Sequence, residues 1–161
     1  MTVTPPLAVD VGRADQRDNY GHIEPMSVHF DDIDATGVVH NMRYGLLLER
    51  AMVAFWARHG HSFNQGRPTT PDAFNVVKEF SISYHTPIRD TGEVGVHFWI
   101  ERLGESSAVY AFRLLSADGR TVYAEGRRVV IKLDQTTLTP SPWTPASRAT
   151  AETLLRPEAA L

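Results

Sequence analysis

Residues 30–56 read FDDIDATGVVHNMRYGLLLERAMVAFW, and the rest of the chain is organised around them. The stretch joins the end of an apolar strand, a turn of small residues at Gly37 and a long helix with a polar start. A helix N-terminus presents unpaired N–H groups and a partial positive charge, so it can polarise a carbonyl oxygen in front of it. Asp34 lies just before that end, where it could attack the carbonyl or steer water onto it.

The helix itself shows apolar residues at spacings of three and four, which predicts an amphipathic helix. Asn41 is the expected N-cap, and the helix should end at about Arg58 or His59. Gly60 is the expected C-terminal stop. The predicted apolar stripe, with Leu48, Met52 and Phe55 beside it, consists of Met42, Leu46, Glu49, Val53 and Trp56, so one carboxylate lies inside it.

Strand patterns occur on both sides of the helix, because apolar residues alternate at period two. One strand is expected at residues 26–30. Four more are expected at residues 74–85, 93–103, 106–115 and 121–133. The pattern predicts an α+β domain in which the long helix lies across an antiparallel meander.

The two ends of the chain lack such periods. Residues 1–25 are expected to form an irregular N-terminal arm. Residues 134–161 form a Pro-rich extension in which Pro145 could begin a short final helix. The expected organisation is therefore one folded domain over residues 26–133 with an extension at each end.

Composition narrows the class of protein. With 161 residues and 42% hydrophobic residues, the chain can bury one substantial core. The absence of Cys excludes disulfides, thiolate metal sites and Cys nucleophiles. A net charge of −3 with scattered basic residues argues against a nucleic-acid partner. Neither a signal peptide nor a membrane-spanning run is visible, so a soluble cytoplasmic protein is expected.

Each candidate residue also has a structural explanation. Asp34 could cap the turn, and His40 and Asn41 could cap the helix. Glu49 could be a buried carboxylate hydrogen-bonded to the backbone or to Tyr44. Their occurrence together, in one order, is what favours catalysis. No metal site is expected, since the pair His59 and His61 lacks a third ligand and His59 is better explained as a C-terminal cap.

These residues resemble a known signature. The run DATGVVHNMRY at residues 34–44, followed by Glu49-Arg50-Ala51, is similar to that of the hotdog-fold acyl thioesterases, in particular the 4-hydroxybenzoyl-CoA thioesterase-like group. The similarity continues through YHTP at residues 84–87, ERLGESS at 101–107, ADG at 117–119 and AEGR at 124–127. It covers about residues 26–133.

The resemblance implies a hotdog fold, in which a long central helix is wrapped by an antiparallel sheet. It further implies a homodimer or homotetramer with active sites at the subunit interface. Asp34 would be the nucleophile or general base, and the backbone N–H of Asn41 would bind the thioester oxygen. The implied substrate-binding residues are Gly37, Val39, Tyr44 and Glu49. The implied contacts to CoA or pantetheine are Ser106, Ser107, Arg127 and Arg128.

His40 marks a departure from the group, many of whose members carry an aromatic residue there and a His at the position of Asn41. The departure weakens the expectation of an aromatic substrate, and His40 could itself donate or accept a proton. The leading function is hydrolysis of an acyl-CoA or acyl-carrier-protein thioester, without metal or redox cofactor. The alternatives are addition of water or an amine to an α,β-unsaturated acyl thioester, and non-catalytic acyl-thioester binding.

Overall fold

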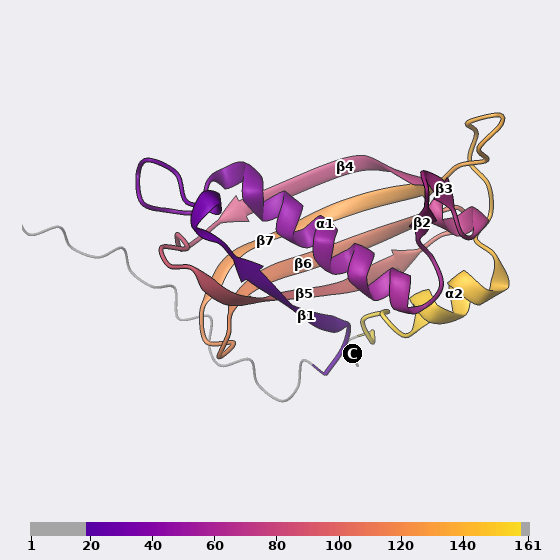
Figure 1. The fold of residues 1–161 in the computed structure, drawn as a ribbon. Coiled ribbons are helices and arrows are strands. Elements are labelled where there is room, and N and C mark those ends of the chain that lie inside the picture. Colours follow the sequence, from indigo (N-terminus) through magenta and orange to yellow (C-terminus); the bar gives the residue numbers. More distant parts are fainter. Residues whose placement is uncertain (1–18, 159–161) are drawn as a thin grey trace, which may run out of the picture.

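The computed structural model describes residues 19–158 (Figure 1). In chain order its elements are β1 (His22–Val28), the 3₁₀ turn η1 (Phe30–Asp32), α1 (Asn41–Arg58), β2 (Phe63–Asn64), β3 (Arg67–Pro68), the 3₁₀ turn η2 (Pro71–Ala73), β4 (Asn75–Tyr84), β5 (Gly92–Leu103), β6 (Ser107–Ser116), β7 (Val122–Lys132) and α2 (Pro145–Glu152). Most of the arm predicted over residues 1–25 lies outside the described residues.

The main sheet has the strand order β1-β5-β6-β7-β4, and each neighbouring pair is antiparallel. The four strands predicted after the helix are observed with bounds shifted by at most one residue. The predicted meander is correct for β5, β6 and β7 only. β4 instead pairs with β7 at the far edge, because strand order is set by how the sheet wraps α1 rather than by position in the chain.

The first strand differs from its predicted bounds. β1 begins at His22, so residues 22–25 belong to the sheet rather than to an irregular arm, and Phe30 lies in η1. Pro25 sits within β1 opposite Gly95. A Pro is tolerated there because β1 is an edge strand, where a missing N–H costs no ladder hydrogen bond.

α1 packs across one face of the sheet (Figure 1). Its buried residues are Tyr44, Leu47, Leu48, Ala51, Met52 and Phe55. The predicted stripe was wrong, since Met42 and Val53 are 73% and 53% exposed and Glu49 is also exposed. The helix is apolar on two faces, and periodicity alone cannot tell which one meets the core. The second apolar face remains uncovered in the single chain.

The ends of α1 are fixed by local chemistry. His40, not Asn41, is the N-cap, because its Nδ1 atom accepts a hydrogen bond from the Met42 amide at 3.1 Å. Asn41 is instead the first helical residue. Gly60 follows the helix with φ +88°, a conformation that glycine adopts without strain, so the predicted stop is observed.

The C-terminal extension returns to the sheet. Pro145 occupies the first turn of α2 as predicted. Beyond the helix, the Ile100 amide donates to the Leu154 carbonyl at 2.8 Å, and the Arg156 amide donates to the Ile100 carbonyl at 2.9 Å. None of the described helices is long and apolar enough to cross a membrane. Helix and sheet together make the α+β hotdog fold that the resemblance implied.

Candidate active site

The loop before α1 is a tight turn anchored to the core. The Asp34 amide donates to the Val38 carbonyl at 2.9 Å, and the Gly37 amide donates to the Asp34 carbonyl at 3.0 Å. Gly37 has φ +80°, which the turn requires. Val39 then donates to the Ile88 carbonyl at 2.8 Å, so the turn presents Asp34 from a fixed base.

The Asp34 carboxylate is held by Thr36. Its Oδ1 atom accepts from the Thr36 amide at 2.8 Å and from the Thr36 hydroxyl at 2.5 Å. These hydrogen bonds, the hydroxyl first, lower the pKa of Asp34 from its ordinary value of 3.8, and the nearby His40 adds a small electrostatic contribution. No side chain of the described residues hydrogen-bonds Oδ2, and the Val38 backbone makes a further contribution that lowers the pKa of Asp34. Asp34 is therefore an ionised group with one oxygen available for chemistry.

This arrangement predicts the acid limb of the pH profile. Because the pKa of Asp34 is lowered, kcat/KM should stay flat as the pH falls and drop only below 3.8. Thr36→Ala removes the hydroxyl donor, so the pKa should rise and the limb should move to higher pH. Thr36→Ser keeps the donor and is the matched control. A limb that moves equally in both variants, or in neither, would contradict this role of Thr36.

The start of α1, which follows the turn that carries Asp34, offers a backbone donor. The Asn41 amide has no acceptor among the described residues, as expected for the first residue of a helix. The Asn41 carbonyl accepts from the Tyr84 hydroxyl at 2.9 Å, which ties the helix start to β4. The Tyr84 ring meets Tyr44 edge-on, with ring centroids 5.0 Å apart.

Two of the predicted substrate contacts hold the loop in place. Val39 is 3% exposed, so its side chain belongs to the core rather than to an open pocket. Tyr44 is also 3% exposed, and its hydroxyl accepts from the Ile88 amide at 3.3 Å. Burial raises the pKa of Tyr44 and keeps it neutral. Both residues brace the junction between loop and helix.

Glu49 lies further along α1 and pairs with Arg128 of β7. Arg128 is 9% exposed and points to the helix side of the sheet. Arg127, the next residue, faces the other side and pairs with Glu101 at 3.3 Å. Neighbouring residues of a strand point to opposite faces. Arg127 and Arg128 therefore lie on opposite faces of the sheet, and the predicted contact of each with CoA or pantetheine stays a prediction.

The predicted serine contacts lie at the opposite end of the sheet from Asp34 (Figure 1). The Ser107 carbonyl accepts from the Trp143 indole at 3.1 Å, so this hairpin lies against the C-terminal extension. The Ser106 carbonyl accepts from the Lys132 amide at 2.8 Å. Within one chain, the structure does not bring Ser106 or Ser107 to the catalytic loop.

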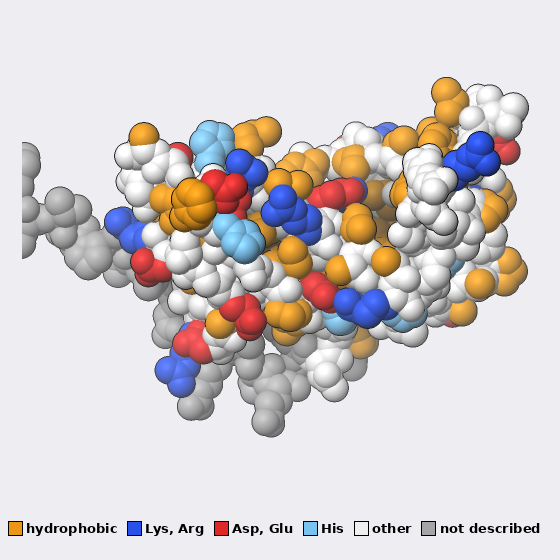
Figure 2. All heavy atoms as spheres, in the orientation of Figure 1, with side chains coloured by type: hydrophobic (Ala, Val, Ile, Leu, Met, Phe, Trp, Pro, Cys, Tyr) orange, Lys and Arg blue, Asp and Glu red, His pale blue; other side chains and the backbone are white. Residues whose placement is uncertain are grey.

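A cavity of about 390 Å³ opens between α1, the β2–β3 hairpin and the C-terminal extension. Figure 2 shows hydrophobic side chains around this hollow. Trp56, Tyr110 and Trp143 line it, together with Glu49 and Arg128. The sequence reading missed this cavity. The available signals were a Trp in a Pro-rich tail and an Arg at an inward position of β7.

Known proteins similar to this chain cover the helix and most of the sheet. A family model described as the thioesterase superfamily matches residues 36–123. The acyl-CoA thioester hydrolase YbgC of Escherichia coli is 28% identical over 116 residues, which are 72% of this chain and 84% of the relative.

Among solved structures, the PA5185 protein of Pseudomonas aeruginosa superposes with a TM-score of 0.77 at 24% identity, over 86% of this chain and 94% of its own. A thioesterase of Thermus thermophilus, solved with coenzyme A and Zn, gives a TM-score of 0.69 at 24% identity, over 87% of this chain and 99% of its own. At this identity the two structures show a shared fold.

Proposed function

Because this chain belongs to the thioesterase superfamily, we propose that it hydrolyses an acyl-CoA thioester at the junction of Asp34 and the N-terminus of α1. The observation that carries the proposal is that the turn holding the ionised Asp34 carboxylate leads directly into α1, whose first amide, that of Asn41, has no acceptor among the described residues. The names of the relatives support CoA as the thiol carrier. An acyl-carrier-protein thioester presents the same reacting bond.

The reaction follows from these two groups. Asp34 attacks the thioester carbonyl or takes a proton from the attacking water. Negative charge then develops on the carbonyl oxygen, where the Asn41 amide stabilises it by about 3 kcal/mol. Collapse of the tetrahedral intermediate breaks the C–S bond and releases a thiolate, a good leaving group that needs no strong acid. Where Asp34 acts as a base, water attacks the thioester itself; where Asp34 attacks, water hydrolyses the resulting acyl–Asp34 anhydride and frees the carboxylate. In both cases water supplies the oxygen and the protons of the products.

His40 is placed to assist rather than to act as a base. Its Nδ1 atom accepts from the Met42 amide, so in the neutral ring the proton resides on Nε2. A base at Nδ1 would have to give up the helix cap. His40 can therefore donate a hydrogen bond near Asp34 but is poorly placed to deprotonate water or an amine. This geometry supports hydrolysis over addition to an α,β-unsaturated acyl thioester.

The experiment compares saturated and 2-enoyl CoA esters, with and without glycine, by free thiol and by product mass. Hydrolysis predicts one free acid for each thiol released from both kinds of ester, unaffected by glycine. An adduct that forms before thiol release would favour addition. If the protein binds the esters but converts none of them, it is a non-catalytic acyl-thioester binder.

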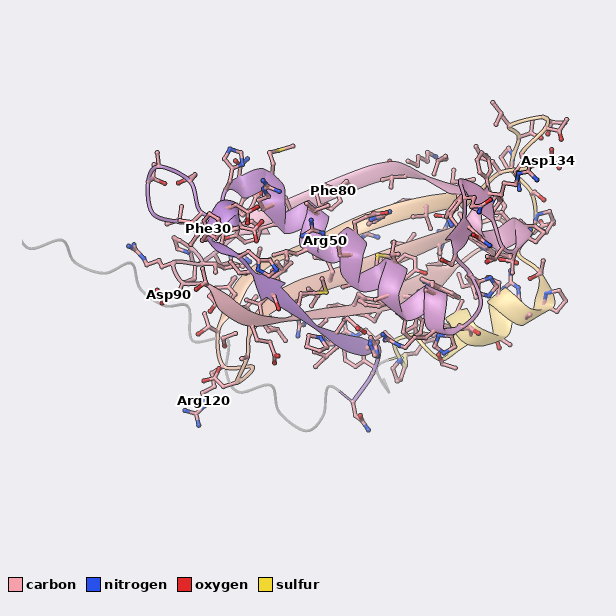
Figure 3. The ribbon with its side chains drawn as sticks, in the orientation of Figure 1. Phe30, Arg50, Phe80, Asp90, Arg120 and Asp134 are labelled. Carbon is pink, nitrogen blue, oxygen red and sulfur yellow. The ribbon has the colours of Figure 1, made fainter. Side chains whose placement is uncertain are left out.

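We further propose that two copies pair through β4. The two edges of the sheet differ, since β1 is interrupted by Pro25 and β4 (Asn75–Tyr84) contains no Pro. Apolar side chains are exposed along β4 and near the start of α1: Phe30, Met42, Val77, Phe80 and Tyr84. Figure 3 shows Phe80 beside the helix and Phe30 at the turn before it. A two-fold axis at the centre of β4 would set Asn75 of one copy beside Tyr84 of the other.

Val77→Lys tests this interface. The protein should behave as a dimer or a tetramer of its 18.0 kDa chain, and a charge at Val77 should shift it to the monomer. Ile23→Lys places the same charge on an exposed apolar position of the β1 edge and should leave the assembly intact. Light scattering after size exclusion measures the mass. Dissociation by Ile23→Lys but not by Val77→Lys would contradict pairing through β4.

A further inference from the structure

The cavity beneath the C-terminal extension has no assigned occupant. We propose that it binds the uncharged acyl chain of the thioester and that the extension sets the longest chain accepted. The inference rests on the proposed thioesterase reaction and names its substrate class. Four properties of the cavity support it: the size, the balance of charges, the position and the rigidity of the far wall.

Size and lining fit an acyl chain. At about 30 Å³ for a water-sized group, the volume of about 390 Å³ holds on the order of ten methylenes. Trp56, Tyr110 and Trp143 supply aromatic walls, and Met52 and Val130 supply aliphatic ones. Burial raises the pKa of Tyr110, so that phenol stays neutral. Such walls favour an apolar guest.

The charges at the cavity are balanced within the protein. Glu49 pairs with Arg128. Asp72 pairs with Lys132 at 3.3 Å, and both side chains are at most 5% exposed. A ligand carboxylate brought here would be desolvated. Its one donor would be the Nε atom of Arg128, which has no partner among the described residues but belongs to a guanidinium whose charge Glu49 already balances. The occupant is therefore an uncharged chain rather than an acyl group that ends in a carboxylate.

The position of the cavity connects it to the catalytic junction. Asn75, the first residue of β4, lines the cavity, and Tyr84, the last, holds the start of α1. In the proposed dimer, the cavity of one copy therefore opens beside the Asn41 amide of the other. Within one copy, Glu49 lies eight residues along α1, about 12 Å from Asn41. An acyl chain reaches the cavity by either route.

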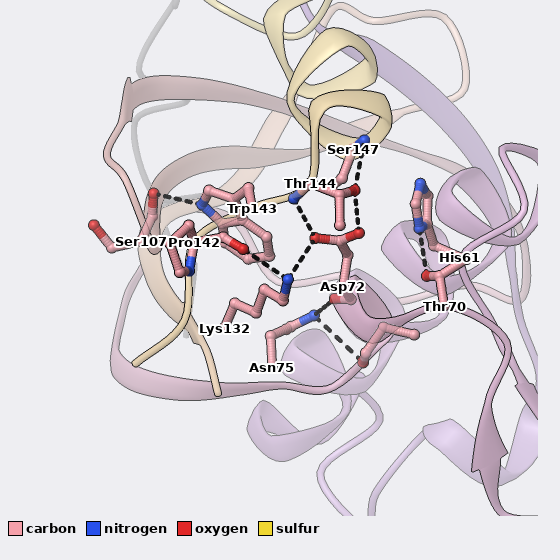
Figure 4. A network of polar contacts seen from close by, with 11 residues as sticks. His61, Thr70, Asp72, Asn75, Ser107, Lys132, Pro142, Trp143, Thr144 and Ser147 are labelled. Atoms are coloured by element: carbon pink, nitrogen blue, oxygen red, sulfur yellow. Dashed lines mark hydrogen bonds and ion pairs between the residues drawn. The ribbon is translucent and has the colours of Figure 1, made fainter. Parts of the chain in front are cut away.

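The far wall is fixed in place (Figure 4). The Thr144 amide and hydroxyl donate to the Asp72 carboxylate at 2.9 and 2.5 Å. Trp143 donates from its amide to the Glu105 carbonyl at 3.0 Å and from its indole to Ser107. Lys132 donates to the Pro142 carbonyl at 2.7 Å. Displacing this wall would break these hydrogen bonds. We therefore expect kcat/KM to fall steeply for acyl chains that are too long for the cavity.

The wall lies outside the part of the chain that the family model matches. The family model ends at residue 123, eleven residues before the extension begins at residue 134. Ala151 of α2 is 4% exposed and lines the cavity, and Ala149 of the same helix faces solvent. The two alanines therefore offer the same substitution on the inner and the outer side of one helix.

The test measures kcat/KM for straight-chain acyl-CoA esters from butanoyl to octadecanoyl. Values should rise by about fourfold for each added methylene, equivalent to about 0.8 kcal/mol, and then fall sharply. Ala151→Leu adds three carbons to the wall and should shorten the optimum by about three carbons. Ala149→Leu should leave it unchanged, and Trp143→Ala should lengthen it. Thermal melts check that each variant is folded.

Hydrolysis with the same optimum in Ala151→Leu and Ala149→Leu would overturn the inference and leave the proposed function standing. If the wild-type protein hydrolyses no ester, the proposed function fails, and the cavity is tested by calorimetry with S-alkyl-CoA thioethers. A shift of the preferred length in Ala151→Leu alone then supports the inference, and its absence overturns it. Equal preference for esters that end in a carboxylate would overturn the assignment of an uncharged chain.

Discussion

Asp34→Asn should lower kcat for thioester hydrolysis by about a thousandfold while KM changes little. An amide can neither attack the carbonyl nor take a proton from water. Its oxygen can still accept the Thr36 amide, which donates to Oδ1 at 2.8 Å, so the turn should keep its shape. Steady-state kinetics on a saturated acyl-CoA ester measure the loss, and thermal melting confirms the fold.

Asp31→Asn is the matched control for this prediction. Asp31 lies three residues earlier, in η1, and its side chain is exposed. The substitution removes the same charge from the same loop region without touching Thr36 or the start of α1. Comparable losses in the two variants would show that local charge, rather than the Asp34 carboxylate itself, supports the reaction.

Asp72→Ala should reduce the free energy of unfolding by about 3–5 kcal/mol, because it leaves the Lys132 ammonium buried without its counter-ion. For a chain of this length the melting temperature should fall by about 10 °C or more. Asp72 also accepts two hydrogen bonds from Thr144, so the extension should loosen with it. Denaturant titration and calorimetry measure both effects.

Two variants calibrate that result. Glu101→Ala breaks the more exposed pair with Arg127 and should cost at most about 1 kcal/mol. Adding Lys132→Met to Asp72→Ala removes the orphaned charge and should recover part of the loss. Equal stabilities of Asp72→Ala and Glu101→Ala would contradict the buried pair as an anchor of the extension.

Local patterns in the sequence identified the elements of the fold well. Strand alternation located β4 to β7 within two residues, and Gly60 marked the end of α1. Strand order was not accessible in this way, because the pairing of β4 with β7 depends on contacts across the whole sheet. The buried face of α1 was misread because Met42 and Val53 continue an apolar stripe on a side that the single chain leaves open.

The candidate site, like the fold, could be predicted only where it depends on residues that are close in sequence. Asp34, His40 and Asn41 are neighbours in sequence, so the turn and the helix start that carry them could be predicted. The cavity could not, since its walls come from α1, the sheet, the β2–β3 hairpin and the C-terminal extension. Trp143 and Arg128 can be identified as cavity residues only once those segments are packed together. The pairing of Arg128 with Glu49 likewise joins residues 79 positions apart.

The Asp34 carboxylate, in the turn before α1, is proposed to drive the hydrolysis of an acyl thioester. The most direct test of this role is the release of free CoA from a saturated acyl-CoA ester, followed side by side for the wild-type protein and Asp34→Asn. We expect steady release by the wild-type protein, matched one to one by free acid, and about a thousandfold slower release by the variant. Release by Asp34→Asn at the wild-type rate would contradict the proposed role of Asp34.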